Sequence, residues 1–379
     1  MKEAIFITGA TGLVGRNLIP RTLKLKPEAG MILLIRGESY SRAEEKFNHL
    51  LNYLAGQLDD PAALQQIYWI WGDITRPRLG LNNFLYGKLV EQTTHIIHAA
   101  AEVRFNLTLE DARAVNYIGT QNIIQLAKDI NDRGHLKRLG YIGTAFISGD
   151  RKGEILETEL DCGQLFFNSY EQSKFEAECY IQKNTENLPV IIFRPSIIVG
   201  DSKTGATCNF NVIYKPLRLI CNGLVRFLPG SRRTKLDIVP VDYVCDSVCH
   251  LMFRRDDAVG RTFHITAGKY YSPDVGEVVR LSLDYFSKIF GSRNIKRVTF
   301  FPAGWHKVLK RYYPAKYRRL DKALKEYEPY LIVNRQFNNT NTRDALRGSG
   351  LRIPKFSEYY ELLLGYCRKT AWGKQVSRA

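Results

Sequence analysis

Two side chains with complementary chemistry, Tyr170 and Lys174, stand four residues apart in the run Tyr-Glu-Gln-Ser-Lys. Residues at this spacing lie on the same face of a helix. An ammonium beside a phenol lowers the pKa of the phenol from its usual value of about 10 toward the working range of a general acid. The pair therefore predicts proton donation by Tyr170, assisted by Lys174, although the pattern alone is common.

A glycine-rich turn near the start of the chain makes this chemistry more specific. The apolar residues 4–8 predict a strand, and a helix is expected from Leu13 to about residue 25. Strand, glycine turn and helix together bind a dinucleotide pyrophosphate, because the N–H groups and the positive dipole end of the helix face the phosphates. The residues expected to form this cradle are Thr8, Gly9, Ala10, Thr11, Gly12, Leu13, Val14 and Gly15.

The second expected strand, residues 31–35, ends at Arg36. Folds that bind NAD usually carry Asp or Glu here to accept a hydrogen bond from the ribose 2′-hydroxyl. A guanidinium suits a 2′-phosphate instead, so we interpret the cofactor as NADP(H). Lys46, in the next helical run, adds a second positive group, whereas Glu38 argues mildly for NAD. A solvated loop residue is the alternative reading of Arg36.

Two later strand ends fit the same sheet. Residues 67–71 lead into Asp73 and Ile74, where we expect the adenine, and residues 95–98 lead into Ala99 and Ala100, whose small side chains leave room for a cofactor. His98 has no partner at metal-ligand spacing, so we interpret it as a hydrogen-bonded strand-end histidine and expect no metal. The alternation of strands and helices to about residue 200 predicts an α/β fold with a doubly wound, parallel, Rossmann-type sheet.

Composition sets the outer limits of function. The chain of 379 residues is 45% hydrophobic and 25% charged, with no low-complexity segment or repeat, which is typical of a globular protein. No apolar run is long enough to cross a bilayer, and the polar start gives no reason to expect a signal peptide. The seven cysteines lack CxxC or metal spacing. Cys245 and Cys249 are interpreted as buried core thiols, and a reducing cytoplasm is expected.

Positive charge is concentrated toward the C-terminal end. Residues 261–379 contain 24 Lys and Arg against 9 Asp and Glu, a net charge of +15, so the first 260 residues carry only +2 of the total +17. Such asymmetry indicates an anionic partner or an anionic membrane surface contacted peripherally. Residues 305–327 predict two basic amphipathic helices, or simply two surface helices. Nucleic acid is disfavoured because no recognition motif is present.

Taken together, the chain resembles the extended short-chain dehydrogenase/reductases. More narrowly it is similar to the fatty acyl-CoA reductase and thioester reductase branch, with an NAD-binding domain of the male sterility type. The resemblance covers roughly residues 1–265, and the stretches that carry it are 8–15, 34–36, 72–74, 79–81, 98–105, 116–120, 142–146, 170–174, 194–205 and 239–244. The glycine motif and the Tyr–Lys pair mark only the superfamily, whereas 194–205 and 239–244 narrow it to thioester reduction.

The resemblance implies NADPH-dependent reduction of an acyl thioester to an aldehyde, or further to an alcohol. It implies that Thr144 holds the substrate oxygen, that Tyr170 donates the proton, and that Lys174 lowers the pKa of Tyr170 and binds the nicotinamide ribose. The residues implied to line the nicotinamide are Pro195, Ser196, Ile197 and Ile198. Asn116 is implied to hold a water or a helix kink, with a plain helix cap as the alternative.

The resemblance also implies the organisation and the partners. We expect a reductase domain over residues 1–265, with a substrate loop at 201–236, and a basic, mostly helical region over 266–379. The loop and the C-terminal helices are expected to form a lid. In the loop, Lys215, Arg218 and Arg226 are candidates to meet phosphate, with a solvated loop as the equal alternative. The expected partner is acyl-CoA or an acidic acyl carrier protein with its phosphopantetheine arm.

Two alternatives stay open. One is an extended reductase of a non-thioester substrate such as a sugar nucleotide or a steroid. The other is a scaffold that senses NADP(H) without chemistry, although such a protein would usually have lost Tyr170 or Lys174.

Overall fold

Seven parallel strands form the central sheet of this computed structural model, which describes residues 3–210, 212–225, 227–291, 298–301 and 326–374. The order across the sheet is β11-β7-β5-β4-β1-β2-β3. The strands are β1 (Ala4–Thr8), β2 (Gly30–Ile35), β3 (Ile67–Trp71), β4 (His95–His98), β5 (Arg138–Ile142), β7 (Val190–Phe193) and β11 (Thr262–Phe263). The predicted doubly wound parallel sheet is therefore confirmed.

Near-continuous apolar sequence explains why these strands lie in the middle. In β1, Ile5 and Ile7 enter one core cluster and Phe6 enters another, on the opposite face. Successive side chains of a strand point to opposite faces, so a strand that is covered on both sides must be apolar throughout. Chain segments of this kind are stable only when helices cover both faces of the sheet.

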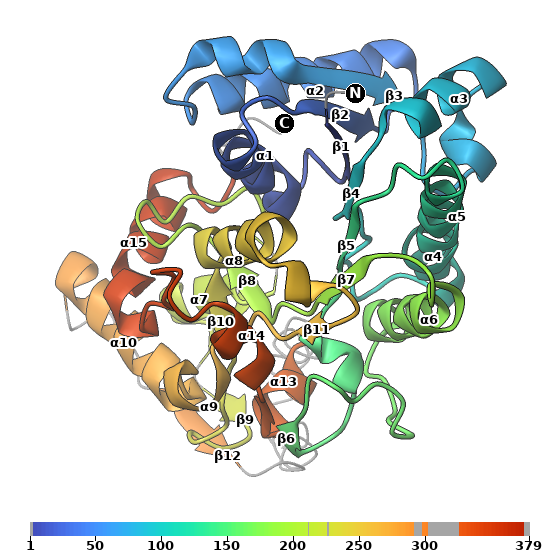
Figure 1. Cartoon of the computed structure of the whole chain (residues 1–379). Coiled ribbons are helices and arrows are strands. Elements are labelled where there is room, and N and C mark those ends of the chain that lie inside the picture. Colours follow the sequence, from blue (N-terminus) through green and yellow to red (C-terminus); the bar gives the residue numbers. More distant parts are fainter. Residues whose placement is uncertain (1–2, 211, 226, 292–297, 302–325, 375–379) are drawn as a thin grey trace.

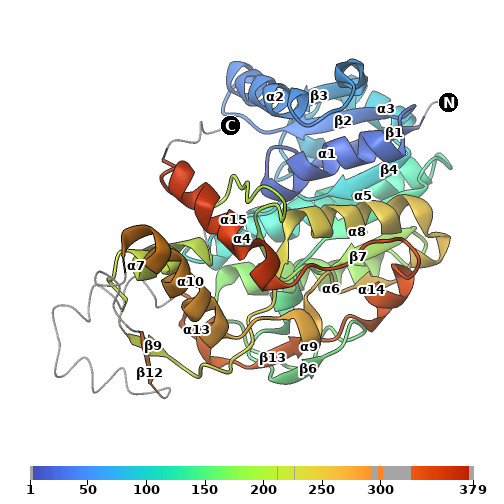
Figure 2. The same cartoon turned by 90° about the vertical axis from the view of Figure 1, so that its left-hand side faces the viewer.

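Helices cover both faces, as Figure 1 shows. One face packs against α1 (Leu13–Leu25), α2 (Tyr40–Ala55) and α8 (Val241–Arg254). The other packs against α3 (Asn83–Gln92), α5 (Gly119–Asn131) and α6 (Ser169–Asn184), with the short α4 (Leu109–Arg113) beside α6. Figure 2 shows α1 and α8 lying side by side over the strands, where Cys245 and Cys249 are buried, as predicted.

A second core lies beyond the carboxyl edge of the sheet. It contains three small parallel pairs: β8 (Ile197–Val199) with β10 (Ile238–Pro240), β9 (Phe227–Pro229) with β12 (Thr299–Phe301), and β6 (Gly153–Ile155) with β13 (Arg335–Phe337). Its helices are α7 (Tyr214–Cys221), α9 (Gly268–Tyr271), α10 (Val275–Phe290), α13 (Glu328–Ile332), α14 (Thr340–Ala345) and α15 (Phe356–Lys369).

Both cores draw on residues from both sides of position 265. The second core includes Phe146 and Ile197, and the core beside α1 includes Leu346. The division into 1–265 and 266–379 therefore stays a prediction. We propose that it separates cofactor binding, in the first part, from substrate or carrier binding, in the second. The two expected basic helices fall mostly in 302–325, which lies outside the described residues. Arg226 also lies outside the described residues.

None of the helices in the described part of the chain has the length and apolar character needed to cross a lipid bilayer.

Candidate functional site

Parallel strands place their carboxyl ends at one edge of the sheet, and the glycine turn after β1 lies there. Gly9 has a φ of +71°, a conformation that side chains disfavour, and a Cβ on Gly15 would lie 2.1 Å from the Gly9 carbonyl oxygen. Only glycine at both positions lets the start of α1 pack this closely on the turn. The tight turn and close helix approach expected from the sequence are both present.

Gly12 is less crowded than these two glycines. A Cβ there would meet only the Gly9 oxygen, at 3.2 Å. Gly12 is also the N-cap of α1, and no side chain caps it. An uncapped helix start beside an open cavity fits a phosphate group, because the first-turn N–H groups and the positive end of the helix dipole favour an anion.

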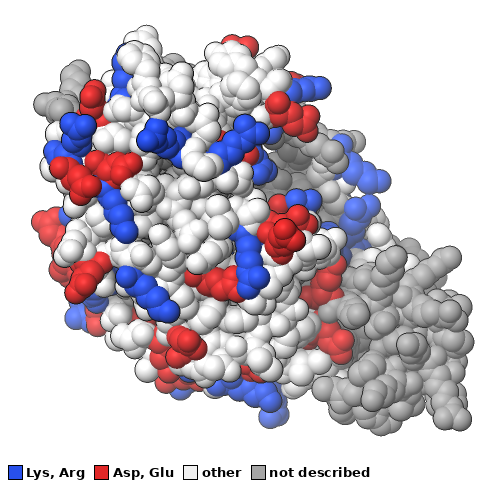
Figure 3. Space-filling model, turned by 90° about the vertical axis from the view of Figure 1, so that its right-hand side faces the viewer, with Lys and Arg blue, Asp and Glu red and all other residues white. Residues whose placement is uncertain are grey.

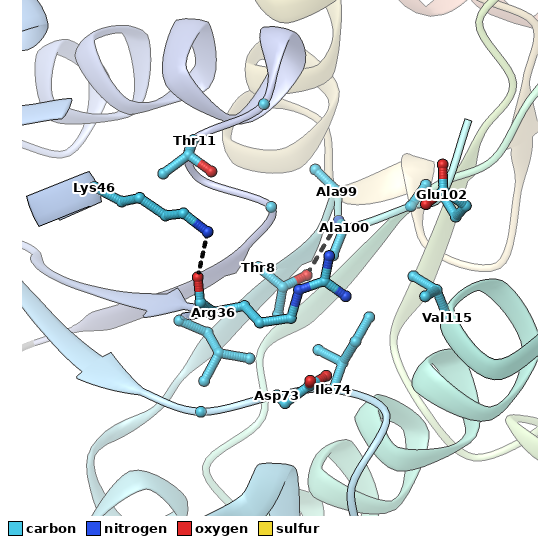
Figure 4. A pocket seen from close by; sticks show the side chains of 15 residues that line it. Thr8, Thr11, Arg36, Lys46, Asp73, Ile74, Ala99, Ala100, Glu102 and Val115 are labelled. Atoms are coloured by element: carbon cyan, nitrogen blue, oxygen red, sulfur yellow. Dashed lines mark hydrogen bonds between the residues drawn. The ribbon is translucent and has the colours of Figure 1, made fainter. Parts of the chain in front are cut away.

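A cavity of about 230 Å³ begins at this turn and runs along the ends of β1, β2, β3 and β4 (Figure 4). It is lined by Thr8, Gly9, Thr11, Gly12, Leu34, Arg36, Lys46, Gly72, Asp73, Ile74, Ala99, Ala100, Ala101, Glu102 and Val115. The Thr8 hydroxyl accepts a hydrogen bond from the Ala100 N–H at 3.3 Å, which fixes the spacing between the two strand ends.

Arg36 and Lys46 place two cations on one rim of this cavity. Figure 4 shows the Arg36 side chain extending across the cavity above Asp73 and Ile74. The Lys46 ammonium donates to the main-chain oxygen of Arg36 at 2.9 Å, so α2 is tied to the end of β2. Both side chains are exposed, as is Glu38. A guanidinium and an ammonium on one exposed rim can together bind a phosphate.

A second cavity, of about 260 Å³, continues toward the ends of β5 and β7 and shares Gly12, Ala99 and Ala101 with the first. It is lined further by Leu13, Val14, Gly15, Val103, Phe105, Ile142, Gly143, Thr144, Phe146, Tyr170, Lys174, Pro195, Ser196, Ile197, Ile198, Asn209, Val212 and Tyr330. All residues predicted for catalysis or cofactor binding therefore line one of the two cavities except Ala10, which is buried.

Thr144, Tyr170 and Lys174 meet in this second cavity. Thr144 follows β5, and its hydroxyl donates to the Pro195 oxygen at 3.4 Å and accepts from the Phe146 N–H at 3.3 Å. Tyr170 and Lys174 lie one turn apart at the start of α6, whose N-cap Asn168 accepts from the Glu171 N–H at 3.0 Å. The sequence pattern and the fold thus bring the three predicted side chains together.

The pKa of Tyr170 shifts against the sequence expectation. Burial raises it to about 12, and the hydrogen bond with Thr144 opposes the shift only in part. Lys174 does not lower it, because its ammonium donates to the Ile142 carbonyl oxygen at 2.8 Å and lies over the Tyr141 ring, 4.2 Å from the centroid. Burial lowers the pKa of Lys174 to about 7. A buried phenol keeps its proton at neutral pH, as a proton donor must.

Two other predicted residues have structural roles around the pair. His98 is buried, with its ring nitrogens 2.7 Å from the Thr8 hydroxyl and 3.2 Å from the Thr120 hydroxyl, which confirms the reading as a hydrogen-bonded core histidine. Asn116 lies in a π-helical turn, so the helix-distortion interpretation is correct and the helix cap is wrong. Its amide donates to the Ser173 hydroxyl at 2.9 Å, next to Lys174.

Aromatic side chains that sequence reasoning did not assign to the site form one wall of the second cavity. The Phe105 and Tyr330 rings are stacked with centroids 5.7 Å apart, and Phe146 meets Tyr330 edge-on at 5.3 Å. Phe105 also lies 5.9 Å from the Tyr170 ring. Phe105 and Phe146 follow recognisable motifs, which was the available signal, whereas nothing local in the sequence relates Tyr330 to a site 160 residues earlier.

The expected substrate loop is tied to the rest of the fold. The Asp242 carboxylate at the start of α8 accepts from the Ser202 N–H at 2.9 Å and from its hydroxyl at 2.5 Å. This contact joins the two stretches that narrow the family resemblance, 194–205 and 239–244. The loop then supplies Asn209 and Val212 to the second cavity. Lys215 and Arg218 lie on α7 and line neither cavity.

The face over α3, α5 and α6 shows no single sign of charge. In Figure 3, Lys and Arg are interspersed with Asp and Glu there. Arg113 and Glu176, for example, form a bidentate ion pair with distances of 2.7 and 2.5 Å. The described residues of this face therefore offer an acidic partner little selective attraction.

A family model described as "Male sterility protein" matches residues 7–248, more than half of the chain. A protein named "Fatty acyl-CoA reductase wat", from Drosophila melanogaster, is 30% identical over 305 residues, which cover 72% of this chain and 56% of that protein. "Non-canonical nonribosomal peptide synthetase cpsA", from Aspergillus campestris, is 30% identical over 285 residues, covering 71% of this chain and 26% of that protein.

Among solved structures, the terminal R domain from the myxalamid PKS-NRPS biosynthetic pathway has a TM-score of 0.79 and 25% identity. The match covers 99% of this chain and 93% of that domain. The chain thus spans about half the length of the fly relative and about a quarter of the synthetase, but nearly the whole of the solved domain.

Proposed function

We propose that this chain, which belongs to the male sterility protein family, reduces an acyl thioester with NADPH. The observation that carries the proposal is that Thr144, Tyr170 and Lys174 line one cavity, which shares residues with the phosphate cradle. The hydroxyls and the cradle share one edge of the sheet, so a substrate carbonyl and a dinucleotide can meet there.

NADPH is the cofactor that the residues fit. The uncapped start of α1 at Gly12 would hold the pyrophosphate, and Arg36 and Lys46 would hold the 2′-phosphate of the adenosine ribose. Asp73 and Ile74 would line the adenine, and 195–198 would line the nicotinamide. When bound, the cofactor supplies a hydride for the carbonyl carbon.

The side chains of this chain would then act on the carbonyl oxygen. The Thr144 and Tyr170 hydroxyls donate hydrogen bonds to it and stabilise the negative charge that develops there. Tyr170 gives up its proton to that oxygen, and burial, which raises the pKa of Tyr170 to about 12, keeps the phenol protonated until then. Lys174, one turn along α6, would orient the cofactor ribose.

The wall of Phe105, Phe146 and Tyr330 favours an apolar acyl group over a polar sugar or nucleotide. Loss of the thiol from the reduced adduct gives an aldehyde, and a second round at the same hydroxyls gives an alcohol. The thiol would belong to coenzyme A or to a phosphopantetheine arm. The relatives named for fatty acyl-CoA reduction and for nonribosomal peptide synthesis motivate both carriers.

The excess of +15 in residues 261–379 supports an anionic carrier, and an anionic lipid surface is the competing partner. The seven unpaired cysteines fit a reducing compartment, so we place the reaction in the cytoplasm.

The test follows NADPH absorbance with an acyl-CoA, an acylated carrier protein and a ketone as separate substrates. Consumption that depends on a thioester, with aldehyde or alcohol as product, supports the proposal. Consumption with the ketone alone identifies the extended reductase of non-thioester substrates. Cofactor binding without any turnover identifies the sensing scaffold.

A further inference from the structure

A buried carboxylate lies directly beside Tyr170 and takes no part in the steps above. Glu171 is fully buried in the first turn of α6. One carboxylate oxygen accepts a hydrogen bond from the Tyr330 hydroxyl at 2.5 Å, and the other accepts from the Phe167 N–H at 3.1 Å. The Asn168 amide donates to the same Tyr330 hydroxyl at 3.0 Å. These contacts tie the start of the helix that bears Tyr170 to α13, more than 150 residues later.

Tyr330 faces two ways. Its hydroxyl enters the buried contact with Glu171, while its ring lines the second cavity and stacks on Phe105. Phe105 in turn lies 5.9 Å from the ring of Tyr170. Any rotation of the Tyr330 ring would therefore change the wall beside the proton donor.

A buried guanidinium, that of Arg335, packs against the Tyr330 and Phe146 rings. Arg335 is only 4% exposed, and its guanidinium lies 5.6 Å from the Tyr330 ring centroid and 5.2 Å from that of Phe146. It donates to the Gly149 oxygen at 2.6 Å and attracts the Glu171 carboxylate. Pairing of β13 with β6 places Arg335 there, so the charge that balances Glu171 arrives with the same C-terminal segment as Tyr330.

We propose that Tyr330 is a positioning residue, whose hydrogen bond to Glu171 fixes its ring against Phe105 and thereby holds the acyl group of the substrate beside Tyr170. The inference rests on the proposed function for the identity of that substrate. A hydroxyl bound to a buried carboxylate is held more firmly than one bound to a neutral acceptor, so this contact determines the ring orientation.

The chain offers a matched pair of variants. Tyr330→Phe keeps the ring and removes the hydroxyl. Tyr86→Phe is the control. The ring of Tyr86 is also buried, and its hydroxyl also donates to a carboxylate, that of Asp129, at 2.6 Å. Tyr86 lies on α3 and lines neither cavity. Tyr330→Phe should raise the KM for the thioester about tenfold and leave the KM for NADPH unchanged. Tyr86→Phe should change neither constant, although both variants lower the Tm.

Hydrogen exchange in the protein with NADPH bound gives a readout that needs no turnover. Tyr330→Phe should speed exchange of the Phe167 amide, which is bonded to Glu171, while exchange in α3 stays at the wild-type rate. Tyr86→Phe should do the reverse. A milder second variant, Glu171→Gln, keeps an acceptor for Tyr330 and should raise the thioester KM less than Tyr330→Phe.

The inference is overturned if Tyr330→Phe leaves both the thioester KM and the Phe167 exchange rate at wild-type values. It is also overturned if the KM values for thioester and NADPH rise together, because that pattern reports general loss of structure. If none of the thioesters supports NADPH consumption by the wild-type chain, the proposed function fails instead. The exchange rates and the KM for the ketone then decide the role of Tyr330.

Discussion

The two halves of the cavity are built in opposite ways. In the cofactor half, the glycine turn after β1 and the segments that follow β2, β3 and β4 form the surface, and the two cations, Arg36 and Lys46, are exposed on the rim. In the substrate half, Phe105, Phe146 and Tyr330 come from distant parts of the chain and form the surface with their rings. One half depends on backbone geometry and the other on how separate segments pack.

This difference decides what each half can tolerate. A main-chain cradle leaves little freedom to vary, because any side chain at Gly9 or Gly15 would overlap the backbone. A wall of packed rings can change its shape by one substitution while the fold persists. We therefore expect family members to share the cofactor half and to differ in the substrate half, and each prediction below tests one side of that contrast.

The largest effect should come from Tyr170→Phe. Removing the hydroxyl removes the proton donor and one of the two donors to the carbonyl oxygen, so kcat should fall by about 10²- to 10⁴-fold. The affinity for NADPH should stay at the wild-type value, because the phosphate cradle lies in the other half. Stopped-flow turnover and fluorescence titration of NADPH measure the two quantities. Turnover at the wild-type rate would remove Tyr170 from the mechanism.

A matched control for this variant is Tyr68→Phe. Tyr68 lies on the edge strand β3 and is 61% exposed, so the loss of its hydroxyl should change neither turnover nor NADPH affinity.

Two glycine variants separate packing from phosphate binding within the cofactor half. In Gly12→Ala the new methyl group meets only one protein atom, so the Tm should stay near the wild-type value. The methyl group would enter the space assigned to the pyrophosphate, and NADPH affinity should fall by about tenfold to a hundredfold. Calorimetric titration and thermal unfolding measure both.

Gly15→Ala should behave differently, because its Cβ would lie 2.1 Å from the Gly9 oxygen and the backbone must move. We expect a lower Tm as well as weaker binding. If Gly12→Ala bound NADPH as tightly as the wild type, the phosphate would have to lie elsewhere.

The cofactor half could be predicted from the sequence because its determinants are local. The glycine spacing of residues 9–15, with an apolar strand before it and a helix after it, specifies the turn without reference to the rest of the chain. The parallel order of the strands then brings Arg36, Asp73 and Ala99 to the same edge. Each of these residues lies within two positions of the end of a strand, so a strand end in the sequence was sufficient to place it.

The substrate half could be predicted only where a motif reported it. Thr144, Tyr170 and Lys174 carry recognisable chemistry, but Tyr330 reaches the site because β13 pairs with β6 and brings the C-terminal segment back. Sequence patterns do not contain such pairings. The prediction of a lowered pKa for Tyr170 was wrong for a related reason. Burial raises this pKa, and burial depends on neighbours that the local spacing of Tyr170 and Lys174 does not reveal.

Lys174 allows a test by pH at the boundary between the halves. Burial lowers its pKa from 10.5 to about 7. Below pH 7 the ammonium is charged in both the folded and unfolded chains. The full cost of burying this charge then lowers the free energy of unfolding. Between pH 7 and pH 10 the folded chain binds fewer protons than the unfolded chain, so the free energy of unfolding rises with pH.

Urea unfolding of the cofactor-free protein measures this rise against Lys174→Met, which has no charge to bury. From pH 7 to pH 9 the wild type should gain about 2 kcal/mol relative to the variant. Parallel pH curves would mean that Lys174 keeps an ordinary pKa in the folded chain. Lys24→Met, which alters an exposed lysine on α1, should run parallel to the wild type.

The smallest effect should come from the exposed rim of the cofactor half. Arg36→Ala should raise the KM for NADPH about tenfold and leave the KM for NADH unchanged, because only the 2′-phosphate needs the guanidinium. Arg42→Ala is the control, since Arg42 lies on α2 but pairs with Glu45 and lines neither cavity. Equal changes in both KM values would show that Arg36 does not read the 2′-phosphate, and the cofactor would then be chosen by the main chain alone. A loss confined to NADPH would instead show that the main-chain cradle leaves the choice of cofactor to one side chain on its rim.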